Sequence, residues 1–210
     1  MKNLLTAVLA TISFAGFAIE APLKDFEEYN NLLGGAKISH LNEDALMKSV
    51  EACANRGNKY CSLNTGIAYF RKEDNEKAFH YLSNADCEFR SEDGKLAWSA
   101  SFYLGALYSA GFGNDPEKKK AIEQFKHCAH MKEGLCAYAV ASIYGSLVHT
   151  PNNLIEAYAW MQIAGKMGTN KIPGRKYVTV QQEIEMMQEI LTPQERRNGD
   201  ELSNKIFSKL

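Results

Sequence analysis

The chain has 210 residues, and its 24 lysines and arginines against 25 aspartates and glutamates give a formal net charge of -1. This balance excludes a basic field that would draw the protein to nucleic acid or to an anionic membrane. Hydrophobic residues make up 45% of the chain and prolines number only 5, which excludes disordered and collagen-like proteins and predicts one globular domain or one repeat array.

The first eighteen residues have the composition of a secretory signal peptide. Lys2 supplies a positive charge, residues 4–17 contain none, and Gly16 and Ala18 place small side chains at a cleavage site. The apolar run is shorter than the ~20 residues that span a bilayer. We therefore predict that residues 1–18 are a cleaved signal peptide, and the alternative is a retained membrane anchor. We therefore expect a periplasmic or secreted protein that begins with a mature N-terminal segment over 19–41.

Four of the five cysteines form two pairs with the same spacing. Cys53 and Cys61 are eight residues apart, and so are Cys128 and Cys136. Eight residues of continuous helix rise ~12 Å, which is more than a disulfide can bridge. Disulfides at this spacing therefore need the chain to turn back between the sulfurs, and the alternative is that the thiols are buried and unpaired.

A glycine lies inside each of the two intervals. Gly57 occupies the first and Gly134 the second, and glycine adopts the left-handed conformation that ends many helices. The sequence therefore predicts that each disulfide joins the end of one helix to the start of the next.

Three segments share one helical pattern in which small residues are followed by a tyrosine: 61–69, 100–113 and 136–144. Each is followed by a second helical pattern, at 76–85, 120–129 and 156–164. Asp115-Pro116 and Thr150-Pro151 each combine an N-cap residue with proline at the first helical position. The repeated unit is predicted to be helix, turn, helix.

Helices are also predicted on both sides of these repeats. A helix over 42–54 leads into Cys53, and apolar residues from Tyr177 to Leu191 recur at helical spacing. Thr192-Pro193-Gln194-Glu195 has the pattern of a capping box that begins a last helix, ending near Leu210. A repeat array must cover its terminal apolar face, and this last helical pair can do so.

The segment from Ala100 to Gly113, ASFYLGALYSAGFG, resembles the Sel1-like repeat family, a relative of the tetratricopeptide repeats, and 157–168, AYAWMQIAGKMG, is typical of a terminal copy. The cysteine spacing resembles that of the disulfide-containing secreted branch typified by the Helicobacter cysteine-rich proteins. The resemblance covers 42–168. It implies an all-α fold, a right-handed α-solenoid of stacked helix-turn-helix repeats at about 55–94, 95–134 and 135–168, preceded by the helix 42–54 and closed by a C-terminal helical cap over 169–210.

The copies depart from the family pattern at a few positions. Ala141 and Leu147 replace glycines in the third copy, and Lys72 replaces one in the first, which predicts less close packing there. Cys87 has no partner because the aligned position is Ala100. Three hypotheses for Cys87 stay open: a buried inert cysteine, a reactive or regulatory thiol, and an intermolecular disulfide.

Motifs for catalysis or metal binding are absent from the sequence. There is no G-x-S-x-G, S-x-x-K, H-E-x-x-H, C-x-x-C or phosphate-binding loop. His127 and His130 flank Cys128, but a disulfide at Cys128 would remove the thiolate that a metal needs. We expect no cofactor and no metal site.

The resemblance implies that the first helices of the repeats line a concave surface that binds a protein partner, with Asn64, Tyr103 and Tyr138 on or near it. The leading hypothesis is a non-enzymatic interaction adaptor in the bacterial envelope, such as an immunity protein, an envelope-assembly partner or a host-contact factor. The alternative, also implied by the resemblance, is a penicillin-binding protein with weak β-lactamase activity. No serine has a lysine three positions later, which disfavours that alternative.

Overall fold

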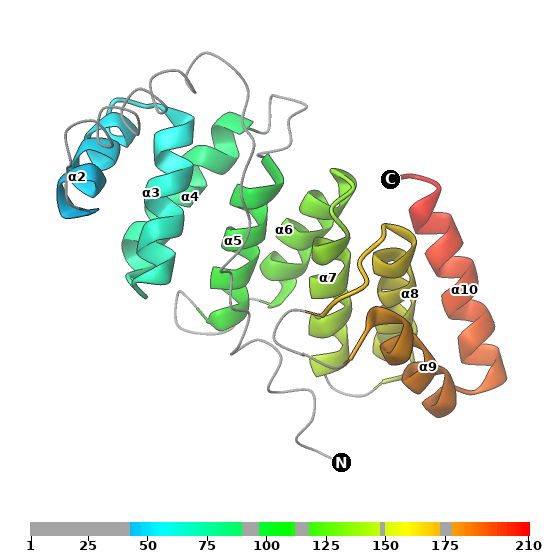
Figure 1. Cartoon of the computed structure of the whole chain (residues 1–210). Helices are drawn as coiled ribbons and strands as arrows, with labels where there is room; N and C mark the ends of the chain where they lie inside the picture. The colour runs from blue at the N-terminus through cyan, green and yellow to red at the C-terminus, as the bar shows by residue number, and fades with distance from the viewer. Residues whose placement is uncertain (1–42, 90–96, 112–117, 148–149, 173–177) are drawn as a thin grey trace. The chain divides into compact units, whose positions relative to one another are not determined.

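The computed structural model describes residues 43–89, 97–111, 118–147, 150–172 and 178–210 (Figure 1). The predicted signal peptide and the segment 19–41 lie outside the described residues, as does Asp115-Pro116. The helices are α2 (Glu43–Ala54), α3 (Lys59–Arg71), α4 (Asn75–Phe89), α5 (Ala97–Ala110), α6 (Lys118–His130), α7 (Gly134–Ser146), α8 (Pro151–Lys166), α9 (Val180–Ile190) and α10 (Pro193–Phe207).

The prediction of an all-α repeat fold is confirmed. Helices α3 and α4, α5 and α6, and α7 and α8 occupy the three predicted repeats, and α2 precedes them. The described residues contain one isolated antiparallel β-bridge, between Lys171 and Thr179, and no strand. The fold is therefore of the α-solenoid class, built from helical hairpins.

The described residues divide into two compact units, one within Ala18–Leu107 and the other within Tyr108–Leu210. In the first unit α3 packs against both α2 and α4. In the second, α7 packs against α6 and α8, and α8 also packs against α9 and α10 (Figure 1). The first helix of a hairpin thus lies between two neighbours, and residues 134–141 of α7 are all buried as a result.

Polar caps set the starts of several helices. The side chain of Thr150 accepts a hydrogen bond from the backbone N–H of Asn153, with Pro151 at the first helical position as predicted. The capping box predicted at Thr192 is present and begins α10. A second capping box at Thr179 begins α9 at Val180, three residues later than the sequence predicted, because the threonine side chain fixes the first turn there.

The two junctions that contain the cysteine pairs reverse direction through equivalent residues. Gly57 has a φ of 90°, in the left-handed region, as predicted. In the second junction the left-handed residue is Lys132, with a φ of 62°, which follows Cys128 by four positions as Gly57 follows Cys53. The prediction that Gly134 makes this turn is wrong.

Gly134 is instead the first residue of α7, at a position where a larger residue would not fit. A Cβ atom at this position would overlap Oγ1 of Thr169 and would lie 2.9 Å from Cβ of Met167. The glycine therefore lets the start of α7 approach the end of α8 closely.

Replacing Lys132 by glycine should stabilise the protein. A residue other than glycine in the left-handed region costs about 1 kcal/mol or more, and the added backbone entropy of glycine offsets part of that gain. Urea denaturation should show a rise of up to about 1 kcal/mol in the free energy of unfolding. Gly57→Ala is the matched control and should lower it, and a loss of stability in K132G would show that Lys132 is not strained.

Candidate functional site

A disulfide closes each of the two junctions. Cys53 at the end of α2 is bonded to Cys61 in the first turn of α3, with 5.7 Å between the Cα atoms. Cys128 of α6 is bonded to Cys136 of α7, with 5.8 Å between the Cα atoms. All four cysteines are fully buried. The first bond joins α2 to the hairpin α3–α4, and the second joins α6 to the first helix of the hairpin α7–α8.

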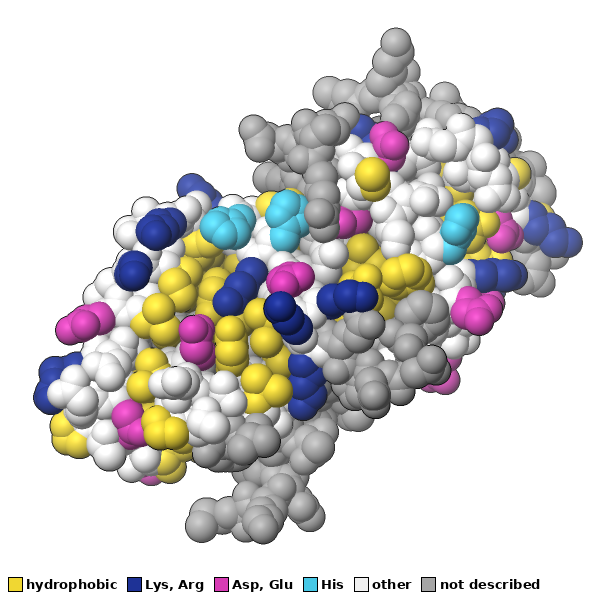
Figure 2. Space-filling model, turned by 180° about the vertical axis from the view of Figure 1, so that it is seen from behind, with side chains coloured by type: hydrophobic (Ala, Val, Ile, Leu, Met, Phe, Trp, Pro, Cys, Tyr) yellow, Lys and Arg dark blue, Asp and Glu magenta, His cyan; other side chains and the backbone are white. Residues whose placement is uncertain are grey.

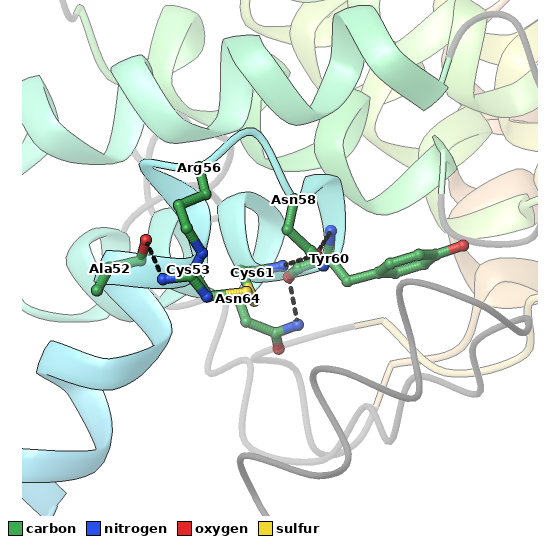
Figure 3. The surroundings of a disulfide bond; sticks show 7 residues. All are labelled: Ala52, Cys53, Arg56, Asn58, Tyr60, Cys61 and Asn64. Atoms are coloured by element: carbon green, nitrogen blue, oxygen red, sulfur yellow. Dashed lines mark hydrogen bonds between the residues drawn. A yellow bond between two sulfur atoms is a disulfide. The ribbon is translucent and has the colours of Figure 1, made fainter.

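Polar side chains satisfy the backbone around the first disulfide (Figure 3). Oδ1 of Asn58 accepts hydrogen bonds from the backbone N–H groups of Tyr60 and Cys61, each at 3.1 Å. Nη1 of Arg56 donates to the backbone carbonyl of Ala52 at 3.1 Å. The end of α2 and the start of α3 are therefore both capped beside the disulfide.

None of the three residues expected on a partner-binding surface is fully exposed to solvent. Asn64 is half-buried, and its Nδ2 donates to the backbone carbonyl of Tyr60 at 2.8 Å. Tyr103 and Tyr138 are buried, with exposed fractions of 5% and 3%. Tyr103 packs edge-to-face against Phe70, and burial raises its pKa. Tyr103 of α5 therefore packs on α3, and Tyr138 belongs to the buried part of α7, which packs against α6 and α8.

Cys87 lies on α4 and is exposed. The hypothesis of a buried inert cysteine is therefore wrong. A reactive thiol and an intermolecular disulfide stay as hypotheses.

An aromatic pair with one acidic and one basic neighbour lies at the first junction. The rings of Tyr69 and Tyr81 stack with centroids 5.9 Å apart. Their hydroxyls donate to Oε1 of Glu51 on α2, at 2.9 and 3.1 Å. Nζ of Lys77 lies 4.7 Å from the centroid of the Tyr69 ring. Burial, and secondly the hydrogen bond to Glu51, raises the pKa of both tyrosines. The carboxylate thus ties α2 to the hairpin α3–α4.

The second junction has a lysine where the first has Glu51, beside the equivalent aromatic residues Tyr144 and Trp160. Nζ of Lys126 on α6 lies 5.4 Å from the ring centroids of both Tyr144 and Trp160 and donates to Oη of Tyr144 at 3.3 Å. Nε1 of Trp160 donates to Oε2 of Glu156 at 3.2 Å. In the repeat alignment Lys126 is equivalent to Glu51 and Glu156 to Lys77. The acidic position of the first junction is therefore basic in the second, and the basic position is acidic.

Reversing the charge of Lys126 should therefore destabilise the second unit. Lys126→Glu removes two cation–aromatic contacts, each worth about 0.5–1 kcal/mol, and brings a second carboxylate near Glu156. Urea denaturation should show a loss of about 1–2 kcal/mol. Lys119→Glu, on an exposed position of the same helix, is the control and should change stability by less than about 0.5 kcal/mol. Equal effects of the two reversals would contradict a specific role for Lys126.

The second unit also contains a groove of about 470 Å³ between α8, α9 and α10. Tyr158, Val180 and Ile184 form its apolar base, and the polar side chains around it include Gln162, Lys166, Gln188 and Asp200. Burial raises the pKa of Tyr158. This groove combines an apolar base with hydrogen-bonding walls, as ligand sites generally do.

Within the described ranges, no group of three histidine, cysteine, aspartate or glutamate side chains is placed to hold a metal ion. No helix among the described residues is long and apolar enough to cross a bilayer.

The overall fold is that of the Sel1-like repeat proteins. A solved structure with this fold, described as the protective antigen c5321 of uropathogenic Escherichia coli, superimposes with a TM-score of 0.62 at 19% sequence identity. The match covers 87% of this chain and 39% of the antigen, so the chain spans well under half of that protein's length. No family model matches the sequence, and no curated protein matches it.

Sequence reasoning predicted the cysteine pairs but missed the groove. Positions 158, 162 and 166 are spaced one helical turn apart on α8, and this row of polar groups within an apolar stretch of the helix was the available signal. Gln188 and Asp200 come from later helices, and only the tertiary fold brings them to the same place.

Proposed function

We propose that this protein is an exported Sel1-like repeat protein that acts as a non-enzymatic adaptor, binding a protein partner in the bacterial envelope. The observation that carries the proposal is the pair of disulfides at the junctions between helical hairpins. Disulfides persist in oxidising compartments such as the periplasm and the cell exterior, and stacked helical repeats offer extended surfaces to other proteins.

The surface chemistry supports a protein partner over a polyanion. Figure 2 shows one face on which basic and acidic side chains are interspersed with hydrophobic ones. Mixed surfaces of this kind suit protein contacts, whereas nucleic acid needs a concentrated positive field. An immunity protein, an envelope-assembly partner and a host-contact factor each fit this proposal, and the identity of the partner decides among them.

The direct test is affinity capture with the oxidised full-length protein from an envelope fraction of its own organism. We expect one partner to be enriched specifically, and the purified partner to bind the purified protein with a measurable Kd in calorimetry. Recovery of the protein alone, with no partner that binds after purification, would contradict the adaptor role.

A second arm of the same experiment addresses enzymatic activity. Incubation of the purified protein with a chromogenic β-lactam should give no turnover above the buffer rate. Turnover that disappears on a single side-chain substitution would instead support a penicillin-binding or β-lactamase function and would overturn the proposal of a non-enzymatic protein.

A further inference from the structure

Large apolar side chains are exposed on α9. In the described part of the chain three such side chains are exposed, and two of them belong to this helix: Ile190 at 67% and Met186 at 45%. The third is Phe207 on α10. Met186 and Ile190 are four positions apart, so they form one row along the helix. Covering this row with another apolar surface would remove it from water, which favours association.

The row lies away from the side of α9 that packs within the fold. Val180 and Ile184 are buried, and their side chains face Gly165 of α8. At 3.6 residues per turn, Met186 and Ile190 lie about 160° and 120° around the helix from Ile184. Helix α8 therefore covers Ile184 and leaves the row of Met186 and Ile190 open.

A second row, next to the apolar one, is acidic. Glu185 and Glu189 are exposed and are also four positions apart, a spacing at which like charges repel each other. Oε1 of Glu185 accepts a hydrogen bond from the neutral amide Nε2 of Gln181 at 3.0 Å. Within the described residues neither glutamate forms an ion pair, so their repulsion is not offset by a neighbouring base.

The charge of α9 indicates the chemistry of a partner. Residues 180–190 contain three glutamates and no lysine or arginine, whereas the whole chain is nearly balanced at -1. A second copy packed through the same side would bring glutamates against glutamates, and an anionic membrane would also be repelled. A basic segment would instead relieve the repulsion between Glu185 and Glu189 while it covers the apolar row.

We propose that this side of α9, formed by Glu185, Met186, Glu189 and Ile190, binds a basic amphipathic helix of the partner protein. The proposal rests on the adaptor function and adds the chemistry of the recognised segment. Rows of side chains four positions apart on one helix pack against the same rows of another. Two apolar side chains of the partner helix thus cover Met186 and Ile190, and lysines or arginines beside them pair with the two glutamates.

The test selects peptides with the oxidised full-length protein. The pool consists of acetylated, amidated peptides of about 15 residues, long enough to form a helix, with an alanine-rich frame and two leucines four positions apart. Lysine, glutamate or glutamine stands at random on both sides of the leucines. We expect bound peptides to be enriched in lysine over glutamate at these positions by at least about fivefold.

Charge reversal is the matched comparison. The variant E185K/E189K should select glutamate in place of lysine. The control E123K/E201K reverses two exposed glutamates on α6 and α10 and so has the same net charge, but it should still select lysine. A pool without lysine enrichment, a preference that survives E185K/E189K, or an equal reversal in the control would overturn the inference.

A second pair of variants tests the apolar row. Ile190→Ser should weaken binding of the selected lysine peptide about tenfold, while Phe207→Ser, at the exposed apolar position on α10, should leave it unchanged. Equal effects of the two variants would contradict docking on α9. Self-association of the unmodified protein that Ile190→Ser abolishes would identify a second copy as the occupant and would also overturn the inference.

The captured partner separates this inference from the adaptor function. We expect E185K/E189K to bind the purified partner at least about fivefold more weakly than E123K/E201K does. If both variants bind it with unchanged affinity, the adaptor function stands and α9 is not the contact. If capture yields no partner at all, the adaptor function itself fails.

Discussion

Replacing both Cys128 and Cys136 by alanine is expected to lower the free energy of unfolding by about 2.5 kcal/mol. The disulfide closes a short loop, and restricting such a loop in the unfolded chain accounts for this value in the chain-entropy model. The Cys53–Cys61 bond has the same separation of eight residues, so its removal should cost a similar amount. Urea denaturation under non-reducing conditions measures both.

Combining the two removals provides a sharper test. The two bonds lie in separate compact units, so their effects should add to about 5 kcal/mol, a large part of the stability of an ordinary domain. Cys87→Ala is the control, because Cys87 is exposed and outside both bonds. If the double removal cost no more than this control, the disulfides would not fasten the junctions.

Replacing Gly66 by alanine is expected to destabilise the first hairpin. The added methyl group would lie 2.6 Å from Cγ of Leu82 and 3.0 Å from its backbone nitrogen. Leu82 is fully buried, so the clash needs a shift of α3 against α4. Overpacking of this kind costs about 1–3 kcal/mol and outweighs the better helix propensity of alanine, which is worth about 1 kcal/mol.

A second alanine substitution isolates the clash from the propensity. At Gly165 the new methyl group would meet its neighbours at an ordinary 3.6 Å, so Gly165→Ala should raise the free energy of unfolding by up to about 1 kcal/mol. Because both variants gain the same helix propensity, they should differ by the clash penalty alone, about 1–3 kcal/mol. In the background of Leu82→Ala the penalty of Gly66→Ala should shrink, and an unchanged penalty would show that the close approach to Leu82 is not its cause.

The helices and the cysteine pairs were predictable because their signals are local. The eight-residue interval, the threonine caps at 150 and 192 and the apolar periodicity depend on residues within a few turns of one another. The fold class followed from the repetition of these signals along the chain.

The errors arose where one residue type serves two purposes. The sequence predicts a left-handed turn at Gly134 because glycine tolerates that conformation. In the structure Lys132 has the left-handed conformation, and Gly134 is needed because a Cβ atom there would overlap Thr169. The resemblance to the repeat family implied that Tyr103 and Tyr138 lie on or near a concave surface, but both are buried. Periodicity identifies a helix but does not show that neighbouring helices cover both of its sides.

Sequence motifs could not predict that the charged residues at the two junctions are exchanged. Glu51 and Lys126 occupy equivalent positions, yet nothing in either local sequence indicates that each contacts an aromatic pair on the following hairpin. Only the packing of α2 on α3 and of α6 on α7 reveals these contacts.

Mass spectrometry of the unreduced protein, isolated from its own cells with thiols blocked at lysis, tests the central claim most directly. The account predicts peptides that link Cys53 to Cys61 and Cys128 to Cys136, with Cys87 in neither link. A link between a cysteine of one pair and a cysteine of the other, or five reduced thiols, would contradict both the fastening of the hairpins and export to an oxidising compartment.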